Sequence, residues 1–360
     1  MPKAFDILAR AARQPRLRQI PSGISAGRHQ LQASHADTLQ TDSNSQNERN
    51  MQTCIQNLID QGAHIFGEIL DADRTQALYR EMVAARAFGA GLFMDEAEYL
   101  AQENHLNANP NKTFNFLNAF EPQLQFIEQD PRLSAVLDEV LGADYEVVIK
   151  KAVCGVPDSW LPDWVREKIR DVNVANLGPY IKKPFRDITY FRGIDFHQDI
   201  IDWPQGRVEL DPSTFLTLYV YLHEVTENDS PLHLMPGTHR FGATLFPHQL
   251  EHQEHDQWTY ADDQGQQMAC QDYRLTGGPG YVGLWHNCTL HGTRPVANES
   301  EQFRLSLRYL LGKSRSNTGK TAIDTINAAI QGELQPIRTR RDLNAKGIAQ
   351  IKGNIINNNG

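Results

Sequence analysis

The second half of the chain carries runs of apolar and polar positions that indicate β-strands. The clearest run is Ser213–Leu222, in which β-branched and aromatic residues dominate. Such side chains suit a pleated surface, and turn-forming pairs such as Asp211-Pro212 and Pro236-Gly237 separate the runs. Many short strands bounded by turns favour an antiparallel sandwich or jelly roll over a fold that alternates strands and helices. The other predicted strand regions are Tyr145–Val153, Tyr180–Phe196, Tyr281–Leu284 and Phe303–Leu311.

A helical period precedes the strands. Asp71–Ala84 reads as a capped helix, and Pro131–Leu141 repeats its apolar residues on one face. A third helix is predicted at Thr321–Ile330. We therefore divide the chain into a polar leader (residues 1–52), a folded domain (53–315) and a C-terminal helix with a polar tail (316–360). Within the folded domain, a helical support (53–141) precedes a β core (142–315).

The N-terminal segment from Met1 to Ser34 is basic, with Asp6 as its one acidic residue. The favoured interpretation is a surface helix or flexible leader in a cytoplasmic protein, and an organellar transit peptide is the alternative. No apolar segment follows Met1, so we expect no secretory signal. No run approaches the roughly 18 apolar residues of a membrane span.

Composition narrows the function before any motif is considered. Lys and Arg number 35 against 44 Asp and Glu, which gives a formal net charge of -9. This balance argues against a general nucleic-acid binder, which needs a basic surface to displace counterions from phosphates. The 4 cysteines form no CxxC pair, so reduced thiols are the simpler interpretation. The chain has 13 histidines, and this excess directs attention to metal chemistry.

The segment Phe196-His197-Gln198-Asp199 is the strongest candidate metal site. Residues i and i+2 of an extended backbone point to the same face, so the His197 imidazole and the Asp199 carboxylate project together. His291, which follows a glycine-rich turn, is the candidate third ligand. Two histidines and one carboxylate on one face are typical of non-haem Fe(II) oxygenases. Zinc could bind the same atoms, although hydrolytic zinc sites more often use other spacings.

A second candidate lies in the strand that follows His291. Alternation places Arg304, Ser306 and Arg308 on one face of this strand. An inward-facing guanidinium needs a partner, and the carboxylate of a cosubstrate would satisfy it with a bidentate pair. An internal ion pair or a surface arginine is the alternative, and alternation does not choose between Arg304 and Arg308.

In their order and spacing these segments resemble the phytanoyl-CoA dioxygenase family of Fe(II)- and 2-oxoglutarate-dependent oxygenases. The family's "HQD", "PGSH" and "HGS" segments correspond to His197-Gln198-Asp199, Pro236-Gly237-Thr238-His239 and His291-Gly292-Thr293, and its strand arginine corresponds to Arg304. The match spans residues 145–311. Threonine replaces the family's serine twice, which keeps the hydroxyl group.

The resemblance implies a mainly β fold, a double-stranded β-helix (jelly roll, cupin-like) with an N-terminal helical support. It implies that His197, Asp199 and His291 bind Fe(II) and that Arg304 and Thr293 bind 2-oxoglutarate. The other implied reagents are O2, ascorbate in a supporting role and a small-molecule substrate. Related halogenases have a small residue in place of the carboxylate, so Asp199 favours hydroxylation of an aliphatic C–H bond, with release of succinate and CO2. The alternatives are desaturation or cyclisation in secondary metabolism, or an inactive jelly-roll binding protein.

Several residues are weaker candidates. Trp203 follows the first two ligands and is a candidate for a substrate lid, and Thr217 and Tyr219 are candidates for the pocket wall. The basic pairs Lys150-Lys151 and Lys182-Lys183 could meet an anionic substrate. The helical spacing of three further histidines predicts a solvated helix face rather than a metal site; they are His248, His252 and His255.

Overall fold

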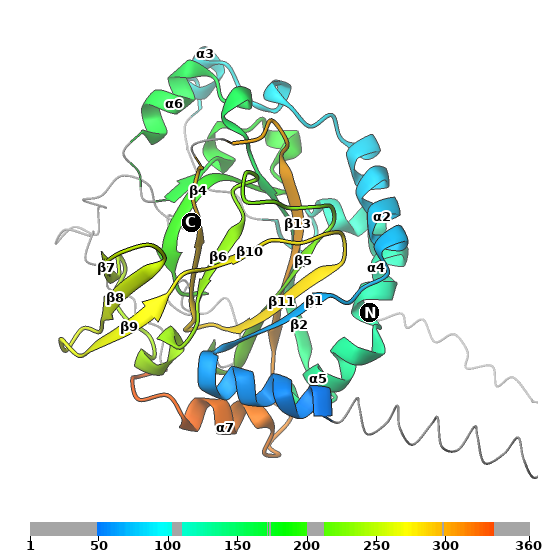
Figure 1. Ribbon diagram of the computed structural model, residues 1–360. Helices are drawn as coiled ribbons and strands as arrows, with labels where there is room; N and C mark the ends of the chain where they lie inside the picture. Colours follow the sequence, from blue (N-terminus) through cyan, green and yellow to red (C-terminus); the bar gives the residue numbers. More distant parts are fainter. Residues whose placement is uncertain are drawn as a thin grey trace, which may run out of the picture. The chain divides into compact units, whose positions relative to one another are not determined.

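The computed structural model describes residues 49–102, 110–170, 172, 174–199, 212–296 and 299–334. Its centre is a ten-stranded sheet in the order β1-β11-β5-β13-β2-β4-β12-β6-β10, with β3 paired to β4 (Figure 1). Every pairing is antiparallel except that of β2 with β4. The strands are β1 (Ala63–Glu68), β2 (Glu146–Gly155), β3 (Val174–Asn176), β4 (Thr189–His197), β5 (Phe215–Tyr221), β6 (Leu232–Met235), β10 (Tyr273–Leu275), β11 (Tyr281–His286), β12 (Leu290–Thr293) and β13 (Arg304–Gly312).

The large sheet is strongly curled. In a flat sheet β4 and β5 would be three strand spacings apart, about 14 Å. Yet Thr217 on β5 reaches Asp199, just after β4, with 2.7 Å between Oγ1 and Oδ2. The inner side chains of the two halves therefore meet across one interior. This arrangement confirms the predicted mainly β, jelly-roll class with helical decoration.

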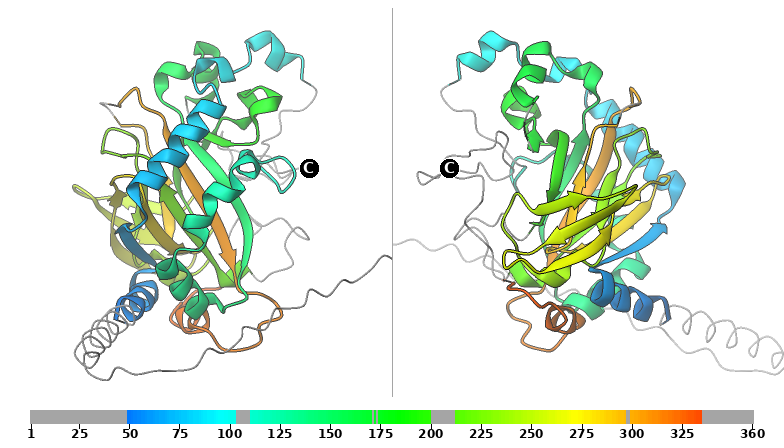
Figure 2. Two further views of the ribbon diagram at one scale, coloured as in Figure 1. Left: turned by 90° about the vertical axis from the view of Figure 1, so that its right-hand side faces the viewer. Right: turned by 60° about the vertical axis from the view of Figure 1, so that its left-hand side comes forward.

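Helices cover the outer face of the sheet formed by β5, β13 and β2, as the left view of Figure 2 shows. In this view α2 (Ala72–Ala85) and α4 (Glu121–Glu128) cross the face, and α5 (Pro131–Leu141) and helix 49–61 lie at its lower end. The predicted caps are present: Asp71 accepts a hydrogen bond from the Arg74 N–H, and Asp130 accepts from the N–H groups of Arg132 and Leu133. One continuous apolar core joins these helices to the sheet, and burial of this kind is the main stabilising term in folding.

The described residues also form three short α-helices: α3 (Glu96–Leu100), α6 (Asp163–Ile169) and α7 (Ala322–Ala328). Thr321 precedes α7, close to the predicted start, and its N–H donates to the Asp324 carboxylate at 2.9 Å. Ile323 and Ile326 of α7 are buried in the main core, which explains why this helix is ordered against the β domain.

A separate three-stranded sheet replaces the helix expected around His252. It consists of β7 (Gln249–His252), β8 (Gln257–Ala261) and β9 (Gln267–Gln271). The prediction of a helix was wrong because the chain reverses at His255, whose φ of 56° belongs to a turn. Alternation along β8 and β9 instead buries Tyr260 and Cys270 against the outer side of the large sheet.

The first described helix includes residues on both sides of the boundary predicted at residue 52. Residues 49–52 belong to helix 49–61, because Met51 continues the apolar stripe of Cys54 and Leu58 and packs on the same core. The segments 1–48 and 335–360 lie outside the described residues. All four cysteines are buried and unpaired. Within the described residues, none of the helices combines the length and the apolar character needed to cross a membrane.

Candidate metal centre

His197 and His291 face each other because their strands are in register. His197 ends β4, His291 lies on β12, and the two are directly paired in the antiparallel ladder. Paired residues of neighbouring strands point to the same face, and the two ring centroids are 4.1 Å apart. Gly292 allows this approach, since a Cβ there would lie 2.7 Å from the carbonyl oxygen of Ile194.

Backbone carbonyl groups fix the tautomer of both rings. Nδ1 of His197 lies 3.1 Å from the Asp195 carbonyl oxygen, and Nδ1 of His291 lies 3.0 Å from the Thr289 carbonyl oxygen. A carbonyl oxygen can only accept, so each Nδ1–H donates and each Nε2 keeps its lone pair. This is the orientation in which a histidine binds a metal ion.

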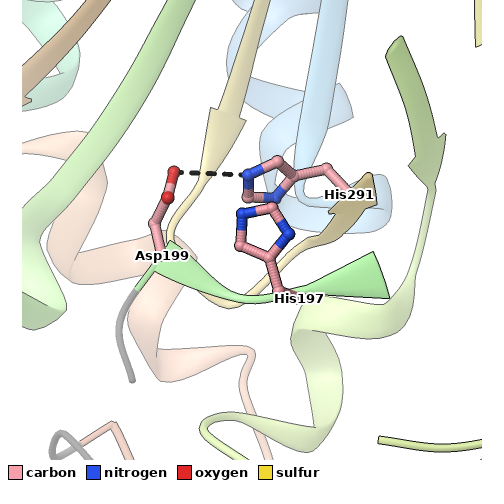
Figure 3. A group of neighbouring side chains, drawn as sticks. All are labelled: His197, Asp199 and His291. Carbon is pink, nitrogen blue, oxygen red and sulfur yellow. Dashed lines mark ion pairs between the residues drawn. The ribbon is translucent and has the colours of Figure 1, made fainter. Parts of the chain in front are cut away.

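The Asp199 carboxylate completes the group (Figure 3). Its Oδ2 lies 3.5 Å from Nε2 of His291, and ligand atoms from all three residues lie within 4.8 Å of one another. Two contacts hold the carboxylate: Oδ2 accepts from the Thr217 hydroxyl at 2.7 Å, and Oδ1 accepts from Nη2 of Arg308 at 2.7 Å. Sequence reasoning placed Arg308 on the right face but did not identify this contact.

Gln198, between two of these residues, points to the opposite face and is fully buried. Its side-chain amide donates to the carbonyl oxygens of Gly242 and Cys288, both at 2.7 Å. Its carbonyl oxygen accepts from the Thr244 N–H at 2.9 Å. These three hydrogen bonds of the Gln198 side chain therefore connect the segment that carries His197 and Asp199 to two loops.

The electrostatics of the site favour the protonation states that bind metal. Burial lowers the pKa of His197 and of His291, and the neighbouring ring lowers that of His197 further. Burial alone would raise the pKa of Asp199, but Arg308 and the two imidazoles hold it well below its ordinary value. Two neutral imidazoles and one ionised carboxylate result. This donor set fits Fe(II), whose protein ligands in oxygenases are two histidines and one carboxylate.

Arg304 is a buried cation at the start of β13, with 1% of its surface exposed. Its guanidinium donates to the Ser230 carbonyl oxygen at 2.5 Å and to the Thr293 hydroxyl at 3.4 Å. Its Nε has no partner, and no acidic side chain of the described residues forms an ion pair with it. A buried guanidinium without a counter-ion is costly, so this site is suited to an anion.

Other unsatisfied polar atoms share the interior with Arg304. They are the Tyr219 hydroxyl, the Trp285 indole nitrogen and the Ser306 hydroxyl, each buried without a hydrogen-bond partner. Ser306 on β13 is paired with Tyr221 on β5, two residues from Tyr219 on the same face. The centroid of the Trp285 ring lies 5.8 Å from that of Tyr219 and 5.1 Å from that of His291. Buried polar groups are normally satisfied, so this set indicates a polar ligand beside the metal. Sequence reasoning did not single out Trp285 or Ser306.

The remaining candidates fall into three groups. Thr217 and Tyr219 lie at the site, whereas Trp203 lies outside the described residues. Lys150 pairs with Glu121 and Glu128 on the helix side, and Lys182 donates to the Gly91 carbonyl oxygen. The buried histidines away from the centre bind backbone or side-chain groups instead; they are His223, His233, His239 and His286.

Comparisons with known proteins agree with this geometry. The family model described as phytanoyl-CoA dioxygenase matches residues 60–306, more than half of the chain. The comparison with curated proteins found no match.

Solved structures give weaker likenesses. The non-heme alpha-ketoglutarate-dependent epimerase SnoN is 12% identical, with 82% of this chain and 98% of that chain covered and a TM-score of 0.44. EctD from S. alaskensis with bound Fe is 15% identical, with 79% and 86% covered and a TM-score of 0.41. EvdO2 from Micromonospora carbonacea var. aurantiaca is 17% identical, with 73% and 90% covered and a TM-score of 0.43.

Proposed function

The chain belongs to the phytanoyl-CoA dioxygenase family of non-haem iron, 2-oxoglutarate-dependent enzymes, and we propose that it hydroxylates an aliphatic C–H bond of a small-molecule substrate. The reaction consumes the substrate, 2-oxoglutarate and O2, and yields the alcohol, succinate and CO2. One oxygen atom of O2 enters the alcohol and the other enters succinate. The observation that carries the proposal is the His197–Asp199–His291 group beside a buried arginine without a counter-ion.

In this proposal the three side chains hold Fe(II) through the two Nε2 atoms and a carboxylate oxygen. The bound iron, with 2-oxoglutarate and O2, supplies the oxidising chemistry. Thr217 and Arg308 orient the carboxylate through the two contacts at 2.7 Å, so that Asp199 presents a fixed oxygen. Backbone carbonyl groups fix the two rings. The ligands therefore need little rearrangement when the metal binds.

Arg304 and Thr293 bind the distal carboxylate of 2-oxoglutarate. The Arg304 guanidinium donates to the Ser230 carbonyl oxygen. Its Cζ atom lies 5.3 Å from the centre of the Phe191 ring. Its charge gives a strong hydrogen bond in a site that excludes water. The Ser306 and Tyr219 hydroxyls supply further contacts for the oxygen atoms of the cosubstrate. Asp199 keeps the carboxylate that halogenases of similar sequence lack, which favours hydroxylation.

The test is the visible charge-transfer band that forms when Fe(II) and 2-oxoglutarate are added without oxygen. We expect the wild-type protein to form this band and to release succinate when oxygen and a substrate are supplied. H197A and D199A should lose the band and lower turnover by at least about 1000-fold, because a metal ligand is missing. A band of wild-type intensity in both variants would refute the assignment.

The mass of the product tests the type of oxidation. Hydroxylation adds one oxygen atom to the substrate, whereas desaturation or cyclisation removes two hydrogen atoms. A screen of compound classes for succinate release, followed by mass spectrometry of the product, separates these outcomes.

A further inference from the structure

We propose that Arg308 anchors a carboxylate group of the substrate, so that the enzyme acts on organic acids with an apolar body. This inference rests on the proposed function, since it assigns a substrate class to the same site. Its support comes from the position and contacts of Arg308, the net charge of the site and the register of β2 with β13.

The first observation is the position of two arginines on β13. Arg304 and Arg308 lie on the same inner face, four residues and about 13 Å apart along the strand. Arg304 is enclosed and neighbours Thr293, two residues beyond His291. Arg308 contacts Asp199 and keeps 17% of its side chain exposed. The metal group therefore lies between an enclosed arginine, which suits the cosubstrate, and an accessible arginine, which suits a second ligand.

The second observation is the unused hydrogen-bonding capacity of Arg308. In the described part of the chain, its one polar contact is the bond from Nη2 to Oδ1 of Asp199. A guanidinium presents a planar fork of N–H donors that matches a carboxylate with two parallel hydrogen bonds. The donors that Asp199 does not use remain available beside the metal centre.

The third observation is the balance of charge. Nδ1–H of each imidazole donates to a backbone carbonyl oxygen and leaves the Nε2 lone pair for a metal ion, so both rings count as neutral ligands. The formal charges of Fe(II), doubly ionised 2-oxoglutarate, Asp199 and Arg304 cancel. Arg308 therefore leaves one net positive charge beside the loaded centre. A substrate with one carboxylate neutralises it.

The fourth observation is the wall next to Arg308. Lys151 on β2 is directly opposite Arg308 in the ladder, so its side chain lies on the same face. Ile149, two residues earlier on that face, is 37% exposed although it is a large apolar side chain. In contrast, Lys150 points to the helix side and is paired with Glu121 and Glu128. A cationic anchor next to exposed apolar surface fits an acid with a hydrocarbon body.

The test compares acids with amides of the same skeleton. Protein loaded anaerobically with Fe(II) and saturating 2-oxoglutarate is titrated with hexanoate or hexanamide, and with phenylacetate or phenylacetamide, while the charge-transfer band is followed. We expect the acids to bind about 10- to 100-fold more tightly than the amides, as hydrogen bonds to a charged group do. Turnover with oxygen should show the same preference in the KM of the acids.

Three variants assign this preference to a residue. R308Q should bind acid and amide alike, while R308K should keep part of the preference because it keeps the charge but not the planar fork. K150Q is the matched control, because it removes a lysine one position from Lys151 that faces the helices and is paired there. It should keep the full preference. The band with 2-oxoglutarate shows in each variant that the centre is assembled.

The possible failures are distinguishable. If the wild-type protein forms no band, the proposed function fails and the anchor fails with it. If the band forms but neither acid binds at millimolar concentration, or acids and amides bind equally, the anchor alone is wrong. An acid preference that persists in R308Q also overturns it.

Discussion

The two faces of strands β5 and β13 are both buried but differ in polarity. On the helix side, Leu305 and Leu307 of β13 join Leu216 and Leu218 of β5 in one apolar core. On the inner side, the same strands present an arginine without a counter-ion and unsatisfied hydroxyl groups, at Arg304, Ser306 and Tyr219. Both faces are buried, but the helix side is an apolar core whose one unsatisfied polar atom on these two strands, among the described residues, is the Tyr309 hydroxyl, whereas the inner side groups several such atoms near the metal group.

This difference separates stability from function along a single strand. A buried polar group without a partner costs free energy, so the inner face lowers the stability of the ligand-free protein. The apolar face offsets that cost through burial. Among the described residues, the inner face therefore keeps polar groups that a ligand could satisfy, and the outer face supplies apolar burial. Four changes test this separation, from the largest expected effect to the smallest.

Replacing Arg304 by methionine should have the largest effect. R304M keeps the approximate length of the side chain and removes the charge, so we expect 2-oxoglutarate binding to weaken by about 2–5 kcal/mol. The free energy of unfolding of the ligand-free protein should stay equal or rise, because an uncompensated buried cation is gone. Titration of the charge-transfer band and urea unfolding measure the two quantities.

R86M is the control for this experiment. The Arg86 side chain is 10% exposed, and it pairs with Asp187 at 2.8 Å on the helix side. Its loss leaves a carboxylate unpaired and should destabilise the protein by about 3–5 kcal/mol without changing 2-oxoglutarate affinity. If R304M destabilises the protein as R86M does, the inner face is structural and the contrast between the faces is wrong.

Replacing Leu307 by alanine, on the same strand, should lower the stability of the protein and leave 2-oxoglutarate binding unchanged, which is the reverse of the result expected for R304M. Leu307 is fully buried in the helix-side core, and the cavity should lower the free energy of unfolding by about 2–5 kcal/mol. The affinity for 2-oxoglutarate should not change, since the side chain points away from the site. A loss of cosubstrate affinity comparable to that of R304M would show that the faces are coupled.

Acid should weaken the fold through histidines that lie outside the metal group. Burial lowers the pKa of His223, His239 and His286 to about 4. Their unfolded forms bind protons near pH 6.5, so their stabilising effect is complete above that pH and is lost as the pH falls towards 4. At pH 5 each histidine should have lost about 2 kcal/mol of stability.

H286Q isolates one of these histidines. The Nε2–H of His286 donates to the Ser213 carbonyl oxygen and to Oδ1 of Asn327, and glutamine keeps a neutral polar side chain. We expect the difference in unfolding free energy between pH 7 and pH 5 to shrink by about 2 kcal/mol in this variant. An unchanged difference in urea unfolding would assign the acid sensitivity elsewhere.

Replacing Thr217 by valine should have the smallest effect. T217V keeps the volume but removes the hydroxyl that donates to Asp199 at 2.7 Å. Loss of one hydrogen bond to a metal ligand should weaken Fe(II) binding about tenfold, at the low end of such effects. Equilibrium dialysis with Fe(II) under anaerobic conditions measures this change. Metal affinity equal to that of the wild-type protein would mean that Arg308 alone orients Asp199.

Local patterns predicted much of this contrast. Alternation in residues 303–311 already assigned Arg304, Ser306 and Arg308 to one face. The spacing of His197 and Asp199 predicted that these two side chains lie together, as they do in the structure. The helix Pro131–Leu141 was predicted with its observed bounds, because its cap and its apolar period are both local signals.

Other features depend on register between distant strands. The pairing of His291 with His197, and the reach of Thr217 and Arg308 to Asp199, follow from the curl of the sheet, which no local pattern contains. The spacing of His248, His252 and His255 matched a helix by coincidence, and burial of Tyr260 in a hairpin decided the structure. The role of Trp203 in a substrate lid stays a prediction.

The buried amide of Gln198 has a consequence for how the centre is assembled. Because its three hydrogen bonds join the segment carrying His197 and Asp199 to two loops, folding itself restricts the positions of these ligands. The conformational entropy of the segment is lost when the chain folds, before any ion arrives. Metal binding then has less disorder to remove, so ion exchange can occur at a site that keeps its shape in the empty protein.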